Sequence, residues 1–139
     1  MATIEFYSQK IRFKLPNTRK TANWLKNVCL LEGHELASLT YVFCSDEYLK
    51  KLNKQYLSHS TYTDILSFDY ADEGKIHGEI YISIPRVKDN ARIFHQSFDL
   101  ELRRVLVHGL LHLMGYLDKQ SSQKAQMRRK EEACLSLWK

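Results

Sequence analysis

The sequence is poor in the residues that interrupt or cross-link a chain. Only two prolines and five glycines occur in 139 residues, and no repeat, low-complexity tract or Gly/Ser-rich linker is present. A chain of this length can bury one substantial hydrophobic core but is too short for two. We therefore predict a single domain that spans residues 1–139.

Cysteine is also scarce. The three cysteines, Cys29, Cys44 and Cys134, lie far apart and form no C-x-x-C pair, so the sequence offers neither a zinc knuckle nor a dithiol redox motif. Free, buried thiols in a reducing compartment are expected. Long apolar runs are missing too, because the richest stretch, residues 105–116, contains two histidines and is far shorter than a membrane span. The first 16 residues lack the apolar core of a signal peptide, and we expect a cytoplasmic protein with no membrane partner.

Neither charge nor hydrophobicity is extreme. Hydrophobic residues make up 44% of the chain and charged residues 27%, which is typical of a folded protein and excludes a largely disordered one. Lysine and arginine outnumber aspartate and glutamate by 21 to 16, for a net charge of +5. This mild excess favours a polyanionic partner, such as a nucleic acid, only slightly.

The spacing of apolar residues predicts four strands and five helices. Strands are expected at residues 4–7, 35–44, 62–70 and 78–84, with the last two as neighbours. We expect Thr18 to cap a helix that runs to Gly33, and Ser45 to cap one that runs to Tyr56. Further helices are expected at residues 86–95, 99–114 and 121–138. The sequence thus predicts an α+β fold, with one mixed sheet of about four strands covered by about five helices.

The most informative segment is HGLLHLMGYLD, residues 108–118. On a helix, His108 and His112 lie one turn apart on the same face, the separation that two imidazoles need to share a metal ion. Gly115 can end that helix in a left-handed conformation and turn Asp118 back toward the histidines. Three protein ligands leave the fourth position of a tetrahedral ion open, as in catalytic zinc sites. We predict one zinc ion held by His108, His112 and Asp118 at the end of a central helix.

Other interpretations of the histidines are open. A pair four residues apart also arises by chance within an exposed polar stripe, but the glycine and the carboxylate favour metal binding. A His-His-Asp set accepts divalent ions other than zinc. No comparable pattern surrounds the other four histidines, which we expect to be solvated or hydrogen-bonded: His34, His59, His77 and His95.

The same segment resembles the hallmark of the YbeY family of endoribonucleases, H-G-x-L-H-L-x-G-Y-x-H. Residues 52–56, 63–68 and 78–83 resemble three further stretches of that family, L-N-x-x-Y-R, T-D-V-L-S-F and G-D-I-x-I-S, in the same order. The resemblance runs from about residue 49 to residue 118. It implies a zinc-dependent enzyme that cleaves single-stranded RNA in ribosomal RNA maturation and ribosome quality control, with the ribosome or ribosomal proteins as further partners.

Two positions depart from the family pattern. The usual third histidine is replaced by Asp118, which can still ligate zinc but makes the site one charge more negative. Leu57 stands where the family carries an arginine thought to contact the substrate phosphate. Arg104, one turn before His108, is a candidate substitute, although a solvated surface arginine is an equally good interpretation. Lys54 and His59 are weaker candidates.

The resemblance and the residue types together predict a catalytic set of His108, Arg104 and Glu79. The ion would lower the pKa of a bound water and stabilise charge on a phosphate oxygen. Whether water or the ribose 2′-hydroxyl attacks the phosphorus is open. Glu79 and Asp64 are candidates for orienting that water or a histidine ligand, and Glu79 can equally be a plain outward-facing strand residue.

Two other functions are consistent with the pattern. The spacing of residues 108, 112, 115 and 118 also fits the metzincin proteases, but these use a glutamate as general base where this chain has Gly109. A non-catalytic ribosome assembly factor with a structural metal is the second alternative. Its RNA contact would be the basic segment at residues 124–130, which on a helix is more often a solvated face.

Overall fold

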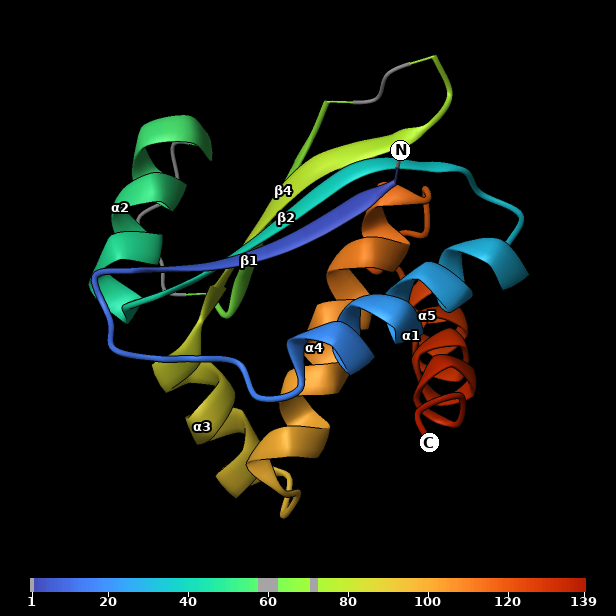
Figure 1. Cartoon of the computed structure of the whole chain (residues 1–139). Coiled ribbons are helices and arrows are strands. Elements are labelled where there is room, and N and C mark those ends of the chain that lie inside the picture. Colours follow the sequence, from blue (N-terminus) through green and yellow to red (C-terminus); the bar gives the residue numbers. More distant parts are fainter. Residues whose placement is uncertain (1, 58–62, 71–72) are drawn as a thin grey trace.

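The structure is a computed structural model that describes residues 2–57, 63–70 and 73–139. Its elements, in chain order, are β1 (Thr3–Gln9), α1 (Thr18–Leu31), β2 (Leu36–Cys44), α2 (Asp46–Leu57), β3 (Ile65–Asp69), β4 (Ile76–Ser83), α3 (Ile84–Ile93), α4 (Phe98–Leu113) and α5 (Ser121–Leu135). Figure 1 shows one sheet with helices on both sides.

The sheet is mixed and has the strand order β1-β2-β4-β3. Strands β1, β2 and β4 run parallel, whereas β3 pairs antiparallel with β4. The predicted α+β fold with a mixed sheet is confirmed, and the strands expected at 62–70 and 78–84 are neighbours as predicted. Strand β4 lies inside the sheet, so its alternate side chains point to opposite faces. This alternation decides which of its residues lie on the side of the candidate site.

Those two faces are covered unequally. Ile80 and Ile82 of β4 belong to the main core, which includes buried residues of α1, α3, α4 and α5. Tyr81, between them, packs instead into a smaller cluster with Leu49 of α2 and Leu66 of β3. Helices α1, α3, α4 and α5 therefore lie on one side of the sheet and α2 on the other (Figure 1).

Helix α4 lies at the centre of the main core. Its buried residues include Leu102, Leu106 and Leu110, and Tyr41 of β2 donates a hydrogen bond from its hydroxyl to the carbonyl oxygen of Leu106 at 2.7 Å. Close to the sheet, α4 carries Gly109, where an added Cβ would lie 2.9 Å from side-chain atoms of Ile65 and Ile80. The absence of a side chain at this position allows the helix to approach the sheet.

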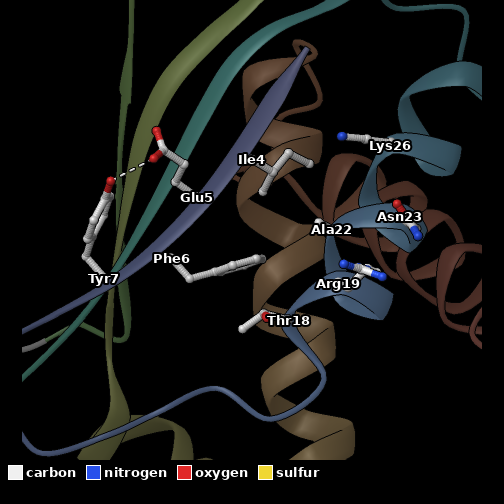
Figure 2. Close-up of a pocket in the computed structure, with 9 residues that line it drawn as sticks. All are labelled: Ile4, Glu5, Phe6, Tyr7, Thr18, Arg19, Ala22, Asn23 and Lys26. Atoms are coloured by element: carbon white, nitrogen blue, oxygen red, sulfur yellow. Dashed lines mark hydrogen bonds between the residues drawn. The ribbon is translucent and has the colours of Figure 1, made fainter. Parts of the chain in front are cut away.

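The edge of the sheet at β1 is partly open. A shallow hollow of about 630 Å³ lies between β1 and α1 (Figure 2), and α1 contributes two exposed cations to it, Arg19 and Lys26. It lies by the edge strand farthest in the sheet order from β3. Among the described residues, no helix is both long and apolar enough to span a membrane.

Several boundaries differ from the sequence prediction. Thr18 is the first residue of α1 rather than its cap, because Asn17 takes the cap position in a left-handed conformation. Helix α3 begins at Ile84, two residues before the predicted start, since the Ser83 hydroxyl accepts a hydrogen bond from the Arg86 amide at 3.3 Å. The cap predicted at Ser45 is confirmed by a hydrogen bond from the Tyr48 amide at 3.2 Å. Helix α5 ends at Leu135, three residues before the predicted end.

The cysteines are free and buried, as predicted. Burial raises the pKa of Cys29 and of Cys134 to about 11, and that of Cys44 to about 12.

Candidate metal centre

Helix α4 brings the two predicted histidine ligands together. His108 and His112 lie one turn apart with their ring centroids separated by 4.6 Å, and their Nε2 atoms are 3.0 Å from each other. Both side chains are mostly buried, with 18% and 28% of their surface exposed. The pair is therefore a converging one and not part of an exposed polar stripe.

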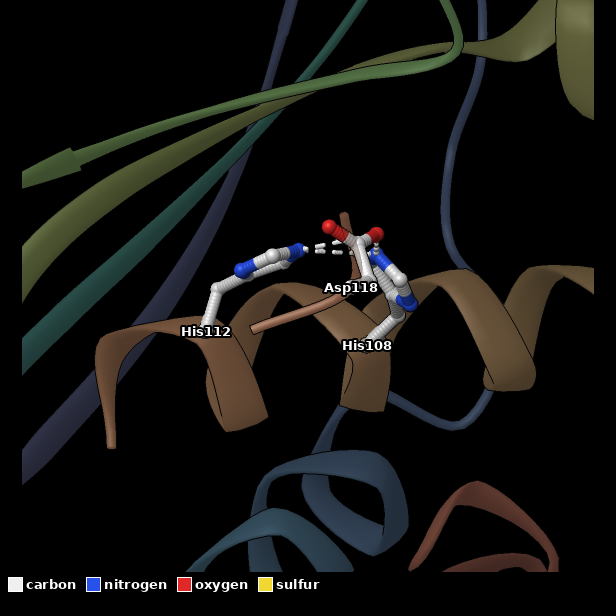
Figure 3. Close-up of side chains that lie close together, drawn as sticks. All are labelled: His108, His112 and Asp118. Carbon is white, nitrogen blue, oxygen red and sulfur yellow. Dashed lines mark hydrogen bonds and ion pairs between the residues drawn. The ribbon is translucent and has the colours of Figure 1, made fainter. Parts of the chain in front are cut away.

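The end of α4 brings the carboxylate to the same point. Gly115 has a φ of +104°, and its amide donates to the His112 carbonyl at 3.0 Å. The Tyr116 amide donates to the Leu111 carbonyl at 3.1 Å. This pair of hydrogen bonds is the Schellman motif, which reverses the chain after a helix. As a result, the Asp118 carboxylate lies beside both histidine rings (Figure 3), with Oδ2 3.2 Å from His108 Nε2 and 3.3 Å from His112 Nε2.

The three ligand atoms fit a divalent ion. Their separations of 3.0, 3.2 and 3.3 Å form a nearly equilateral triangle. In a tetrahedral zinc site with ligand bonds of about 2.0–2.1 Å, ligand atoms lie about 3.3–3.4 Å apart. Two imidazole nitrogens and one carboxylate oxygen are also the donor types that such an ion accepts. His108, His112 and Asp118 can thus bind a metal ion.

Glu131 of α5 orients one of these ligands. The Nδ1 atom of His108 donates a hydrogen bond to Glu131 Oε2 at 2.5 Å, which leaves the lone pair of Nε2 facing the other two ligands. Glu131 was not predicted from the sequence. One signal was present, because Met127, Glu131 and Cys134 follow helical spacing and all three are buried. A charged residue on an otherwise apolar helix stripe requires a buried partner.

Arg104 joins the same network. It lies one turn before His108, as predicted, but its guanidinium donates to Glu101 and, at 3.2 Å, to Glu131 Oε1. Glu101 and Glu131 are almost completely buried. Although burial lowers the pKa of Arg104, the hydrogen bonds and charges of the two carboxylates outweigh it and raise the pKa. Arg104 is therefore not a solvated surface arginine, and its contacts suit the positioning of Glu131.

The site has a surplus of negative charge. Burial lowers the pKa of His108, but the hydrogen bond to Glu131 and the charges of Glu131, Asp118 and Asp64 outweigh it, so the pKa is raised. Surroundings that stabilise a cationic imidazole also stabilise a divalent cation at the same point. Asp64 is thus close enough to act on the centre, and its Oδ2 accepts a hydrogen bond from Asn90 at 3.3 Å.

The structure does not bring Glu79 to the metal centre. The neighbours of Glu79 on β4, Gly78 and Ile80, both face α4. Strand alternation places Glu79 on the opposite face of the sheet, where its carboxylate accepts a hydrogen bond from the Tyr70 hydroxyl at 2.9 Å. Glu131, and not Glu79, accepts the hydrogen bond from the histidine ligand His108.

The structure gives no support to the weaker phosphate-contact candidates. Lys54 is exposed on α2, and His59 lies outside the described residues. The described histidines other than His108 and His112 do not join the metal-binding group. Position 109 faces the sheet, where even an added Cβ would lie 2.9 Å from side-chain atoms of Ile65 and Ile80. A glutamate that acts as general base, as in the metzincins, would therefore not fit at this position.

Comparison with known proteins agrees with this geometry. The family profile described as Endoribonuclease YbeY matches residues 3–139, a longer stretch than the motifs alone covered. A protein of that name from Cytophaga hutchinsonii is 47% identical over 138 residues, which cover 99% of this chain and 96% of the relative. Another from Amoebophilus asiaticus is 46% identical over 131 residues, covering 94% and 89% of the two chains.

A solved structure has the same fold. The solution structure of TM1509 from Thermotoga maritima superposes with a TM-score of 0.68 at 25% sequence identity, covering 97% of this chain and 88% of that one. Together with the near full-length match to the family profile, these findings show that the chain belongs to the YbeY endoribonuclease family.

Proposed function

We propose that this protein is a zinc-dependent endoribonuclease that cleaves single-stranded RNA in ribosomal RNA processing and ribosome quality control. The observation that carries the proposal is the convergence of His108 Nε2, His112 Nε2 and Asp118 Oδ2 within 3.3 Å of one another. Membership of a family whose relatives are named endoribonucleases supplies the reaction class.

The residues of this chain hold and orient the centre. His108, His112 and Asp118 would hold the ion, and a bound ion supplies positive charge that acidifies water and stabilises negative charge on a phosphate oxygen. Glu131 keeps the proton of His108 on Nδ1, so that Nε2 is available as a ligand. Arg104, the predicted catalytic arginine, balances the charge of Glu131 and of Glu101.

The rigid surroundings favour catalysis over a purely structural metal. Both histidines are on the central helix α4, which packs within the main core, and the Asp118 turn is closed by backbone hydrogen bonds. Structural zinc sites are usually closed by four protein ligands, whereas the candidate group among the described residues has three and leaves a position open for water. We therefore favour an enzyme over a non-catalytic assembly factor.

The purified protein should cleave a fluorescently labelled single-stranded RNA, and a chelator should abolish the cleavage until zinc is restored. Casein should remain intact under the same conditions. His112→Ala should stay folded by circular dichroism but lose metal, by elemental analysis, together with cleavage. Chelator-sensitive proteolysis with intact RNA would reverse the assignment, and unfolding of His112→Ala would indicate a structural ion.

A further inference from the structure

A hollow beside the metal centre has basic walls. Helices α4 and α5, together with the turn between them, enclose about 180 Å³ that is lined by Arg104, Asp118, Lys124, Met127, Arg128 and Glu131. One of the three metal ligands, Asp118, forms part of this wall. Anything that occupies the hollow therefore lies directly beside the metal centre.

The cations that line this hollow differ in their salt-bridge partners. The charge of Arg104 is engaged by Glu101 and Glu131. Lys124 and Arg128 are exposed, lie four residues apart on the same face of α5, and form no salt bridge with the other described residues. These two side chains are available to an anionic ligand.

The basic surface continues away from the metal centre. A second hollow, of about 430 Å³, shares Lys124 and Arg128 with the first and adds Arg129 and one acidic residue, Glu132. Lys130, in contrast, pairs with Glu32 at 3.0 Å and lies over the Tyr116 ring. Within the segment at residues 124–130, Lys124 and Arg128 are exposed and line the hollows, whereas Lys130 has a structural contact.

We propose that Lys124 and Arg128 form a phosphate-binding subsite that holds the RNA strand beside the metal centre. This inference rests on the proposed function. A polyanion that approaches Asp118, Glu131 and Asp64 meets like charge, and cations at the rim of the site offset that repulsion. Lysine and arginine are the residues that contact phosphates in nucleic-acid complexes. The subsite supplies the phosphate contact for which Arg104 was one candidate.

A charge-reversal experiment with a matched control tests the subsite. The test variant is Lys124→Glu/Arg128→Glu, and the control is Arg19→Glu/Lys26→Glu, which reverses one lysine and one arginine at the hollow between β1 and α1. Binding of a non-cleavable single-stranded RNA is measured by fluorescence anisotropy between 50 and 200 mM salt. Cleavage and metal content are measured on the same preparations.

The test variant should bind RNA at least tenfold more weakly at the lowest salt and show a raised KM, with wild-type metal content and melting temperature. Loss of two phosphate contacts should also reduce the slope of log K against log salt by about 1.4. The control should change affinity less than threefold. A neutral variant, Lys124→Gln/Arg128→Gln, should fall between the wild type and the reversed variant.

Equal weakening by both reversed variants would mean general attraction to a basic protein and would overturn the subsite. Wild-type KM and affinity in the test variant would overturn it too. Failure of the proposed function has a different signature, namely a wild-type protein that does not cleave RNA in a chelator-sensitive manner.

Discussion

Glu131 of α5 accepts a hydrogen bond from the Nδ1 atom of His108 on α4, 23 residues earlier in the chain, at 2.5 Å. The carboxylate is almost completely buried and also receives the guanidinium of Arg104 at 3.2 Å. A metal-binding histidine generally needs such a partner to hold its tautomer and ring orientation. The packing of α5 against α4 is therefore part of the metal centre.

Replacing Glu131 should weaken metal binding. Glu131→Gln removes the negative charge that holds the Nδ1 proton of His108, and we expect metal affinity to fall by about 10–100-fold. Competition with a chromophoric chelator measures the change. Glu132→Gln, at the exposed neighbouring position, is the control and should keep the wild-type affinity. Equal affinities of Glu131→Gln and the wild type would remove Glu131 from the centre.

Asp118 should tolerate histidine but not alanine. The carboxylate oxygen lies 3.2 and 3.3 Å from the two Nε2 atoms, so Asp118→Ala removes a direct ligand and should lower metal affinity by more than about 100-fold. Asp118→His supplies another donor atom and should purify with one metal ion per chain, as judged by elemental analysis. Asp99→Ala, in the exposed first turn of α4, should not affect metal content. Full metal occupancy in Asp118→Ala would exclude the carboxylate as a ligand.

Gly109 should not tolerate even alanine. The added Cβ would lie 2.9 Å from side-chain atoms of Ile65 and Ile80, and overpacking of this kind outweighs the better helix propensity of alanine. We expect Gly109→Ala to lower the free energy of unfolding by about 1–2 kcal/mol in urea titrations. Adding Ile65→Val, which removes one of the crowding methyl groups, should restore part of the loss. Strictly additive effects of the two substitutions would argue against a steric cause.

Glu32 should stabilise the fold in a pH-dependent way. Burial raises its pKa, but hydrogen bonds from the Tyr116 hydroxyl at 2.6 Å and from Lys130 at 3.0 Å outweigh that effect, so the pKa is lowered. A lowered pKa means that the unfolded state takes up a proton first, so the stabilisation is complete above the ordinary glutamate pKa of about 4.3 and is lost as pH falls below it.

At pH 7, Glu32→Gln should lower the free energy of unfolding by about 0.5–1.5 kcal/mol. The difference from the wild type should shrink as the pH is lowered through 4. Glu35→Gln, whose side chain is 80% exposed and 3.8 Å from Lys75, should have little effect at either pH. A constant difference across this range would show that the charge of Glu32 does not contribute.

The convergence of His108, His112 and Asp118 could be predicted because their arrangement is local. His108 and His112 are juxtaposed by the repeat of a single helix, and Asp118 is turned back by a glycine whose φ of +104° suits few other residues. The strands were predictable for a similar reason, since alternation of side chains along β4 is visible in residues 78–83. Helix ends were predicted less well, because caps such as Asn17 and Ser83 compete with neighbouring residues.

The residues around the ligands depended on contacts between elements distant in sequence. From the sequence alone, Glu79 was a reasonable partner for a histidine. In the structure, α4 packs on the face of the sheet toward which Gly78 and Ile80 point, so Glu79 lies on the opposite face. Arg104 lies on the predicted turn of α4, but only the docking of α5 brings Glu131 within reach of its guanidinium. The local sequence contains no information about which carboxylate a buried cation will meet.

By itself, the sequence determined the α+β fold class and the three atoms that can hold an ion, because both follow from helical periodicity, strand alternation or one tight turn within a short stretch, and its motifs carried the resemblance to the family. Tertiary structure alone decided that Glu131 orients His108, that Glu79 faces away, and that Lys124 and Arg128 line a hollow beside Asp118. These relationships are set by the packing of α5 on α4 and of α4 on the sheet, which joins residues that no local pattern connects.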